Sequence, residues 1–118
     1  PETVAWWKSQ PKKSRIEVFG TKNRVPIQDA LSDFGKWCNF GEMVTQSQYI
    51  WSHGATYDIP ILGTMYQLCN MKIPWNYWNA RDTRTIYDFH GIKLSKNNHN
   101  ALYDSYNQIK GIWECTMK

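Results

Sequence analysis

The chain has 118 residues, enough for one domain with a single hydrophobic core. Apolar residues make up 42% and charged residues 20%, which excludes a disordered chain and a coiled coil. There is no long apolar run and no basic-then-apolar leader, so we expect no membrane span and no secretory signal. The three cysteines form no C-x-x-C pair, so we expect no disulfide framework and no zinc knuckle, and a reducing, cytoplasmic environment.

The basic charge is concentrated at the start of the sequence. Residues 1–24 carry six bases and two acids, whereas residues 25–118 carry eight of each, so the net charge of +4 belongs to the first segment. A basic arm beside a neutral body suits a polyanionic partner such as a nucleic acid. The alternative is a solvated, charged face with no partner.

The first third of the chain predicts two helices. Residues 4–10 form a short helical segment that Pro11 ends, and residues 12–24 are expected to be a basic loop or a frayed helical turn. A second helix starts near Pro26 and stops at Gly41. Its apolar stripe falls at helical spacing: Ile27, Ala30, Leu31, Phe34 and Cys38.

The remaining elements are expected to be a strand, a helix, an aromatic loop and two further helices. In chain order they cover residues 48–52, 59–70, 73–78, 84–89 and 100–115. Asp82 or Thr83 is expected to cap the fourth of these elements. The last helix is expected to turn one apolar face to the core: Leu102, Tyr106, Ile109, Ile112 and Trp113.

This pattern contains one clear strand among five helical segments. A single strand cannot satisfy its own backbone hydrogen bonds, and a small sheet needs about three strands. Either further strands escape this pattern, or the sheet partners lie outside these 118 residues, most naturally before Pro1 or on a partner chain.

Three clusters of residues have the chemistry of a catalytic site. His99 precedes the last helix and Asp104 lies in it, which suits a general base and a ligand for a hard divalent cation. Asp58 follows a strand at the start of a helix, where ligands gather in open α/β sheets. The third cluster covers residues 81–84. The simpler interpretation is helix capping and surface charge in all three places.

In this order, the clusters resemble the DEDDh (DnaQ-like) 3′–5′ exonuclease superfamily. The resemblance rests on HGATYD at residues 53–58, DT at 82–83 and HNALYD at 99–104. The blocks PETVAWWKSQ, HGATYDIPIL, PWNYWNARDTRTIYD and HNALYDSYNQIK are similar to the phage exonuclease A group and its relatives, which include a mycobacterial exoribonuclease. The resemblance spans nearly the whole chain.

The resemblance implies a ribonuclease H-like α/β fold, in which helices flank a mixed sheet, and removal of nucleotides from a 3′ end with two Mg²⁺ or Mn²⁺ ions. It makes Asp58 and Asp104 metal-binding carboxylates and His99 the general base that deprotonates the attacking water. It places His53 near the scissile end of the substrate, and it makes Tyr57 the aromatic residue beside the second-motif aspartate, Asp58. In the DT element, the resemblance favours a structural role for the aspartate.

The sequence departs from the family in one respect. The family's first motif, Asp-x-Glu, is absent, and no D-x-E or D-x-D triplet occurs. In the family this motif precedes the PETVAWWKSQ-like block. The missing carboxylates and the shortage of strands agree, so we expect residues 1–118 to be a single, N-terminally incomplete exonuclease domain without its first strands, and to be inactive alone.

Substrate contacts are expected from the basic arm and from aromatic residues. We expect phosphate contacts from Lys12, Lys13 and Arg15, and a substrate contact from Arg81. Base stacking is expected from tryptophans that the core does not absorb: Trp6, Trp7, Trp75 and Trp78. The partner would be a single-stranded 3′ end, with DNA slightly favoured over RNA, and a homodimer is possible. The rival interpretation is a decayed, non-catalytic nucleic-acid-binding remnant.

Overall fold

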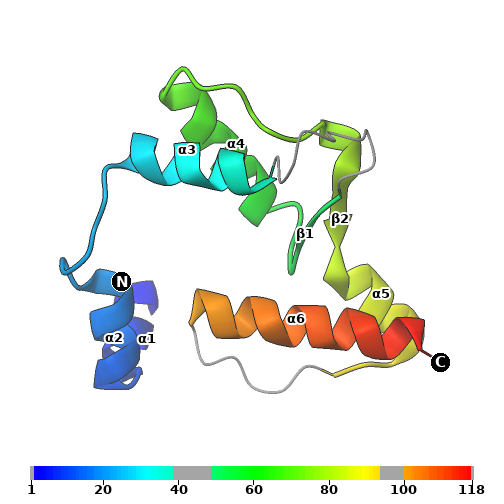
Figure 1. Ribbon diagram of the computed structural model, residues 1–118. Helices are drawn as coiled ribbons and strands as arrows, with labels where there is room; N and C mark the ends of the chain where they lie inside the picture. The colour runs from blue at the N-terminus through cyan, green and yellow to red at the C-terminus, as the bar shows by residue number, and fades with distance from the viewer. Residues whose placement is uncertain (1, 39–48, 94–99, 118) are drawn as a thin grey trace. The chain divides into compact units, whose positions relative to one another are not determined.

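The computed structural model describes residues 2–38, 49–93 and 100–117 (Figure 1). These residues form two compact units, one from Pro1–Arg24 with Ile92–Lys118 and one from Val25–Gly91. The described elements are α1 (Glu2–Ser9), α2 (Lys12–Phe19), α3 (Ile27–Cys38), β1 (Ile50–Ser52), α4 (Asp58–Leu68), the 3₁₀ turn η1 (Tyr77–Asn79), β2 (Ala80–Asp82), α5 (Thr83–His90) and α6 (Ala101–Thr116). The α/β class is therefore confirmed. None of the described helices is long and apolar enough to cross a membrane.

Helix α2 replaces the basic loop that the sequence predicts. Its sequence, KKSRIEVF, separates apolar from polar residues so weakly that periodicity gave no sign of a helix. Its C-terminal end is capped by a side chain from the segment that follows the helix. Arg24 Nε donates to the Gly20 carbonyl at 2.7 Å, and Arg24 Nη2 donates to the Val18 carbonyl. A guanidinium at this end also complements the helix dipole.

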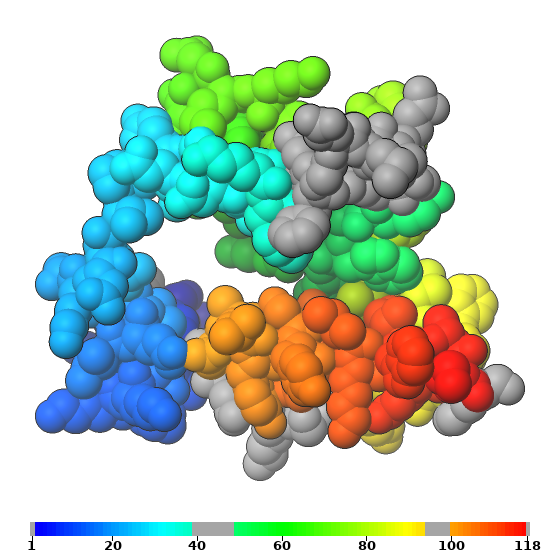
Figure 2. Space-filling view, viewed as in Figure 1, coloured from blue at the N-terminus to red at the C-terminus, as the bar shows by residue number. Residues whose placement is uncertain are grey.

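Helices α1 and α2 lie side by side (Figure 1), and they contact each other through aromatic rings. The Trp7 and Phe19 rings pack edge to face with their centroids 5.0 Å apart, and Trp6 packs on Trp7 in the same way at 4.9 Å. Neither helix has a buried residue. Their side chains therefore lie largely at the surface, as the space-filling view shows (Figure 2).

Helix α6 begins at a polar cap. The Asn100 side chain accepts a hydrogen bond from the Tyr103 N–H at 2.9 Å, and its amide nitrogen donates to the Glu17 carboxylate, which links α6 to α2. The two buried residues of α6 are Gly111 and Cys115.

The core face predicted for α6 is mostly wrong. Four of the five residues predicted to face the core are exposed: Leu102, Tyr106, Ile109 and Trp113. Apolar periodicity identifies which face gains from burial, but burial also needs a surface to pack against. No described element of the same unit covers this face.

The second unit contains a parallel pair of strands. Strands β1 and β2 pair with Ile50 opposite Ala80, Trp51 opposite Arg81 and Ser52 opposite Asp82. Because the strands are parallel, the chain must cross over between them, and α4 supplies the helix of this connection (Figure 1). The sequence predicted β1 but missed β2.

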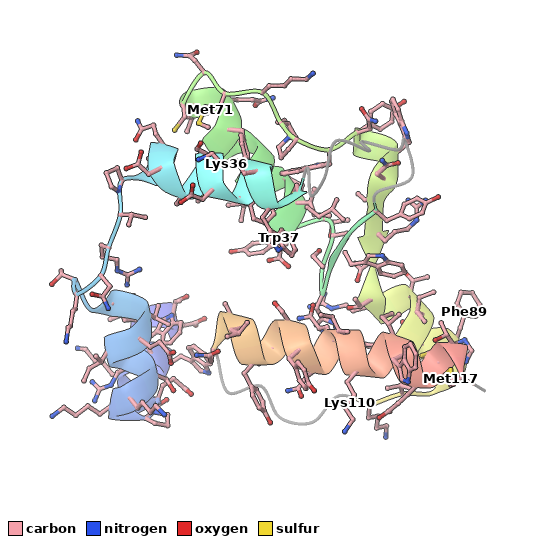
Figure 3. The ribbon with its side chains drawn as sticks, viewed as in Figure 1. Lys36, Trp37, Met71, Phe89, Lys110 and Met117 are labelled. Atoms are coloured by element: carbon pink, nitrogen blue, oxygen red, sulfur yellow. The ribbon has the colours of Figure 1, made fainter. Side chains whose placement is uncertain are left out.

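The small core of this unit joins α3 to α4. Tyr66 is 1% exposed, and its hydroxyl donates to the carbonyl of buried Leu31 at 2.6 Å. Trp75 packs edge to face against both Tyr66 and Phe34. Large apolar side chains also remain at the surface of the chain, among them Trp37, Phe89 and Met117 (Figure 3).

We expect Tyr66→Phe to lower the free energy of unfolding by about 1 kcal/mol, because the change removes one buried hydrogen bond and keeps the ring. The matched control is Tyr77→Phe, since Tyr77 is 84% exposed and should tolerate the loss of its hydroxyl. Urea denaturation of both variants measures the difference. Equal stability of the two variants would contradict the role of the Tyr66 hydroxyl.

Candidate functional site

The carboxyl ends of β1 and β2 lie at the same edge of the sheet. Ser52 ends β1 and pairs with Asp82, which ends β2. A tight turn then leads from β1 into α4, and β2 passes directly into α5 (Figure 1). This is the edge at which polar side chains converge in open α/β folds.

Asp82 holds the two strand-to-helix connections together. Its Oδ2 accepts a hydrogen bond from the Ala55 N–H at 2.9 Å, and its Oδ1 accepts one from the Arg84 N–H at 3.0 Å. Burial by itself would raise the pKa of this carboxyl. The N–H donors of Arg84, Ala55 and Gly54 and the Arg84 guanidinium together lower the pKa below its ordinary value. The predicted capping role of Asp82 is confirmed.

The turn after β1 requires glycine at position 54. Gly54 is buried and has a φ of +126°, which side chains on an L-residue rarely adopt. A Cβ at this position would also lie 3.4 Å from a guanidinium nitrogen of Arg84. The carbonyl of Gly54 accepts the N–H groups of Tyr57 and Asp58, at 2.8 and 3.1 Å. The turn is therefore compact enough to start α4 at Asp58.

His53 is held by Thr83, to which the sequence analysis gave no role beyond helix capping. His53 Nδ1 lies 2.9 Å from Thr83 Oγ1, and the tautomer decides which atom donates. Thr83 is 2% exposed, and the His53 ring also stacks at a tilt on Tyr87, with centroids 5.8 Å apart. With Nδ1 held in this way, Nε2 is the nitrogen that can meet a ligand.

We expect Thr83→Val to remove the fixed orientation of the His53 ring at nearly constant volume. The free energy of unfolding should fall by about 1 kcal/mol, since a buried polar contact is lost. The ¹⁵N shifts of the imidazole should change toward a tautomer mixture. Thr83→Ser keeps the hydroxyl and is the control, and unchanged imidazole shifts in Thr83→Val would contradict this role.

Asp58 and Tyr57 are open to solvent at the start of α4. Tyr57 is 70% exposed, and Asp58 is the exposed first residue of the helix. The positive end of the helix dipole favours a negative charge at this place. The pair therefore offers a carboxylate and an aromatic ring, side by side, to a molecule from solution.

Asp104 lies in the other compact unit, in the first turn of α6. Its Oδ1 is buried and has no hydrogen-bond partner among the described residues. Helical spacing puts Asp104 on the same face as Gly111 and Cys115, the two buried residues of α6. A buried carboxylate oxygen without a partner is costly, and such groups mark places where a cation or a water belongs.

Ser52 is a second residue to which the sequence analysis assigned no role. Its Oγ is buried at the end of β1 and finds no hydrogen-bond partner in the part of the chain that the structure describes. The only signal in the sequence was a hydroxyl residue at the end of a predicted strand, next to His53. Such a residue is common in loops and does not by itself indicate a site.

The other predicted site residues have varied surroundings. Arg81 Nη1 donates to the carbonyls of Trp78 and Ala80, at 2.7 and 2.8 Å, and its guanidinium lies 4.1 Å from the centre of the Tyr49 ring. The basic residues Lys12, Lys13 and Arg15 are exposed on α2. His99 lies outside the described residues.

The structure thus brings His53, Tyr57 and Asp58 into one turn and fixes that turn through Asp82 and Thr83. It places Asp104 and the basic residues of α2 in the other unit. Within residues 2–38, 49–93 and 100–117, no group of three His, Cys, Asp or Glu side chains gathers closely enough to hold a metal ion. The predicted metal site is therefore not assembled by the described residues within one unit.

Comparison with known protein families shows which family the chain is related to. The chain matches the family described as the 3′-5′ exoribonuclease Rv2179c-like domain over residues 1–116. No curated protein matches the chain significantly, and no solved structure does. The match covers almost the whole sequence and confirms the DnaQ-like 3′–5′ exonuclease relationship that the HGATYD and HNALYD blocks predict. The chain belongs to the Rv2179c-like 3′-5′ exoribonuclease domain family.

Proposed function

We propose that the intact protein is a metal-dependent 3′–5′ exonuclease that removes nucleotides from RNA 3′ ends. The observation that carries this proposal is the family match over residues 1–116. Because the family description names an exoribonuclease, we place RNA before DNA, and this replaces the slight lean toward DNA taken from the phage-like blocks. The DEDDh assignment and the ribonuclease H-like fold are part of the same proposal.

Asp58 and Asp104 are the carboxylates that we propose for Mg²⁺ or Mn²⁺. Asp104 fits because its Oδ1 is buried without a hydrogen-bond partner in the described segments. Asp58 fits because it is exposed at the start of α4, where substrate can reach it. Carboxylate oxygens are the donors that these cations prefer. A divalent cation, when bound, would neutralise the charge that develops on the scissile phosphate.

We assign the proton transfer to His99 and substrate positioning to the turn after β1. An imidazole titrates near neutral pH, so the His99 ring suits acceptance of a proton from the attacking water. The turn presents His53 through Nε2, because Thr83 holds Nδ1. Tyr57 is exposed beside Asp58 and suits contact with the terminal nucleotide. Arg81 is proposed to act at the edge of this surface, steadied by its two carbonyl contacts.

Two carboxylates do not satisfy two metal ions. Each Mg²⁺ demands near-octahedral oxygen coordination, and the sequence has no D-x-E or D-x-D triplet to add bridging carboxylates. We therefore propose that these 118 residues alone are inactive or nearly so. Activity is expected only where further carboxylates complete the site, which is why the assays use the intact protein.

The test is a degradation assay on matched RNA and DNA oligonucleotides that carry a 5′ label. With Mg²⁺ or Mn²⁺, the intact protein should shorten RNA progressively from the 3′ end and release mononucleotides. EDTA should stop the reaction, and an oligonucleotide with a blocked 3′ hydroxyl should survive longer. Cleavage at internal positions, or equal products with and without metal, would overturn the proposal.

The same assay separates the alternative, a catalytically inactive nucleic-acid-binding remnant. The basic residues of α1 and α2 favour binding whether or not the chain is catalytic. A remnant would bind oligonucleotides in a salt-dependent manner and leave their length unchanged at every metal concentration. That outcome would retain the fold relationship and remove the activity.

A further inference from the structure

An open groove of about 840 Å³ runs between α1 and α2, and it lies wholly within one compact unit. Its lining combines two kinds of side chain. The apolar ones are Trp7, Ile16 and Phe19, and the cationic ones are Lys8, Lys12 and Arg15. The described residues that line the groove include no acidic side chain. The groove therefore suits a ligand that has both apolar and anionic parts.

The aromatic part of the groove is fixed in place. Trp7 packs edge to face on Phe19 and on Trp6, with centroid separations of 5.0 and 4.9 Å. Phe19 nevertheless keeps 61% of its surface exposed, and Ile16 keeps 60%. An ordered aromatic pair that stays in water offers a platform on which a planar group can stack without much loss of side-chain freedom.

The cationic part of the groove has unbalanced charge. Lys8, Lys12 and Arg15 form no ion pair among the described residues. Glu17, the acid of α2, is hydrogen-bonded by the Asn100 side chain. Arg24, by contrast, is bound to the carbonyls at the end of α2 and acts as a cap. The basic residues of this segment therefore fall into two groups, those that line the groove and those that lie elsewhere.

We propose that the groove between α1 and α2 binds a single-stranded stretch of nucleic acid, with a base against Trp7 and Phe19 and the adjoining phosphates on Lys8, Lys12 and Arg15. A single strand repeats a planar base and an anionic phosphate at each nucleotide, which matches the two kinds of lining. A membrane surface is broad and flat, whereas the groove is concave. This inference rests on the proposed nuclease function, because it names where the enzyme holds its substrate strand.

The decisive comparison uses two double variants that remove the same charge. Lys12→Ala with Arg15→Ala takes two cations from the groove, and Lys22→Ala with Lys93→Ala takes two exposed cations of the same unit that do not line it. The probe is a 5′-fluorescein oligouridylate, and its anisotropy is measured on the full-length protein in EDTA, so that no degradation occurs. The salt concentration is varied for each variant.

The groove variant should lose about tenfold in affinity, and its slope of log affinity against log salt should fall by about 1.4, as expected for two lost contacts to a single strand. The Lys22/Lys93 variant should lose about twofold. Phe19→Leu should weaken binding with an unchanged salt slope, whereas Phe89→Leu, which removes a still more exposed ring on α5, should change nothing. Thermal unfolding checks that each variant folds.

Equal losses in the two double variants would overturn the proposal, because a diffuse basic field would then explain binding. Binding of an acidic peptide or of anionic vesicles in preference to the oligonucleotide would also overturn it. The degradation assay keeps the two proposals apart. If binding depends on the groove but the oligonucleotide is not shortened with metal, the nuclease proposal is refuted and the groove proposal stands. If the oligonucleotide is shortened but the two double variants lose affinity equally, the groove proposal is refuted and the nuclease proposal stands.

Discussion

Replacing Asp104 by asparagine in the intact protein should abolish 3′-end degradation while the fold persists. The change keeps the shape of the side chain and removes the charge that we propose to neutralise a divalent cation. Several kcal/mol of transition-state stabilisation by a metal correspond to a rate loss of about a thousandfold. The rate is measured on 5′-labelled RNA at saturating Mg²⁺. Asp58→Asn should have an effect of similar size.

The same substitution, Asp104→Asn, should not lower the stability of the fold. In the absence of metal, the buried Oδ1 of Asp104 has no partner among the described residues, and its charge is costly to bury. Asp104→Asn should therefore leave the free energy of unfolding unchanged or raise it by about 1 kcal/mol. A catalytic loss without a stability loss is the signature of a residue kept for function.

The matched control on the same helix is Glu114→Gln. Glu114 is exposed and lies 4.0 Å from Lys110, so its charge contributes little to stability and none to the proposed site. This variant should degrade RNA at the wild-type rate. If Asp104→Asn also degrades RNA at that rate, Asp104 is not a metal ligand. If it unfolds instead, Asp104 has a structural role that its missing partner hides.

Elements with strong periodicity could be predicted from the sequence. The apolar stripe predicted α3, the cap at Asp82 predicted α5, and apolar spacing over residues 100–115 predicted α6; the predicted bounds of α5 and α6 lie within one residue of the observed ones. These signals are local, because a helix cap and its donor lie within one turn of each other. Such local signals can be recognised within the sequence of the element itself.

Elements decided by their neighbours could not be predicted. Strand β2 has the sequence ARD, too short and too polar to show alternation, and it is a strand because it pairs with β1. Helix α2 lacks an apolar stripe and depends on Arg24 for its end. In both places the deciding contact comes from another segment, which a pattern within the segment does not contain.

The candidate site residues also fall into those that the sequence suggested and those that it did not. The sequence suggested His53, Asp58 and Asp104 through the family resemblance of the HGATYD and HNALYD blocks, and their roles stay a prediction. It did not identify Thr83 as the partner of His53 or Ser52 as a buried hydroxyl, since both depend on the register of the two strands. The groove between α1 and α2 also depends on how two helices pack.

Asp82 carries the largest stability effect that we expect in the chain. Asp82→Ala removes the cap of α5 and the acceptor for the Ala55 N–H in one step. A lost cap and a lost hydrogen bond together should lower the free energy of unfolding by about 2 kcal/mol at neutral pH. Asp82→Asn keeps one acceptor oxygen and should have an intermediate effect. Urea denaturation of the three proteins gives the order directly.

The pH dependence gives an independent check. The pKa of Asp82 is lowered in the folded state, so folding favours the charged form of this carboxyl group. Its contribution is fully present above the ordinary value of 3.8 and is lost as the pH falls through the lower folded-state value. The difference in stability between wild type and Asp82→Ala should therefore stay constant above pH 3.8 and narrow as the pH falls below it. Asp88→Ala, an exposed acid of the same helix, should give no such gap, and a gap that stays constant from pH 7 to strong acid would show that the Asp82 charge plays no part.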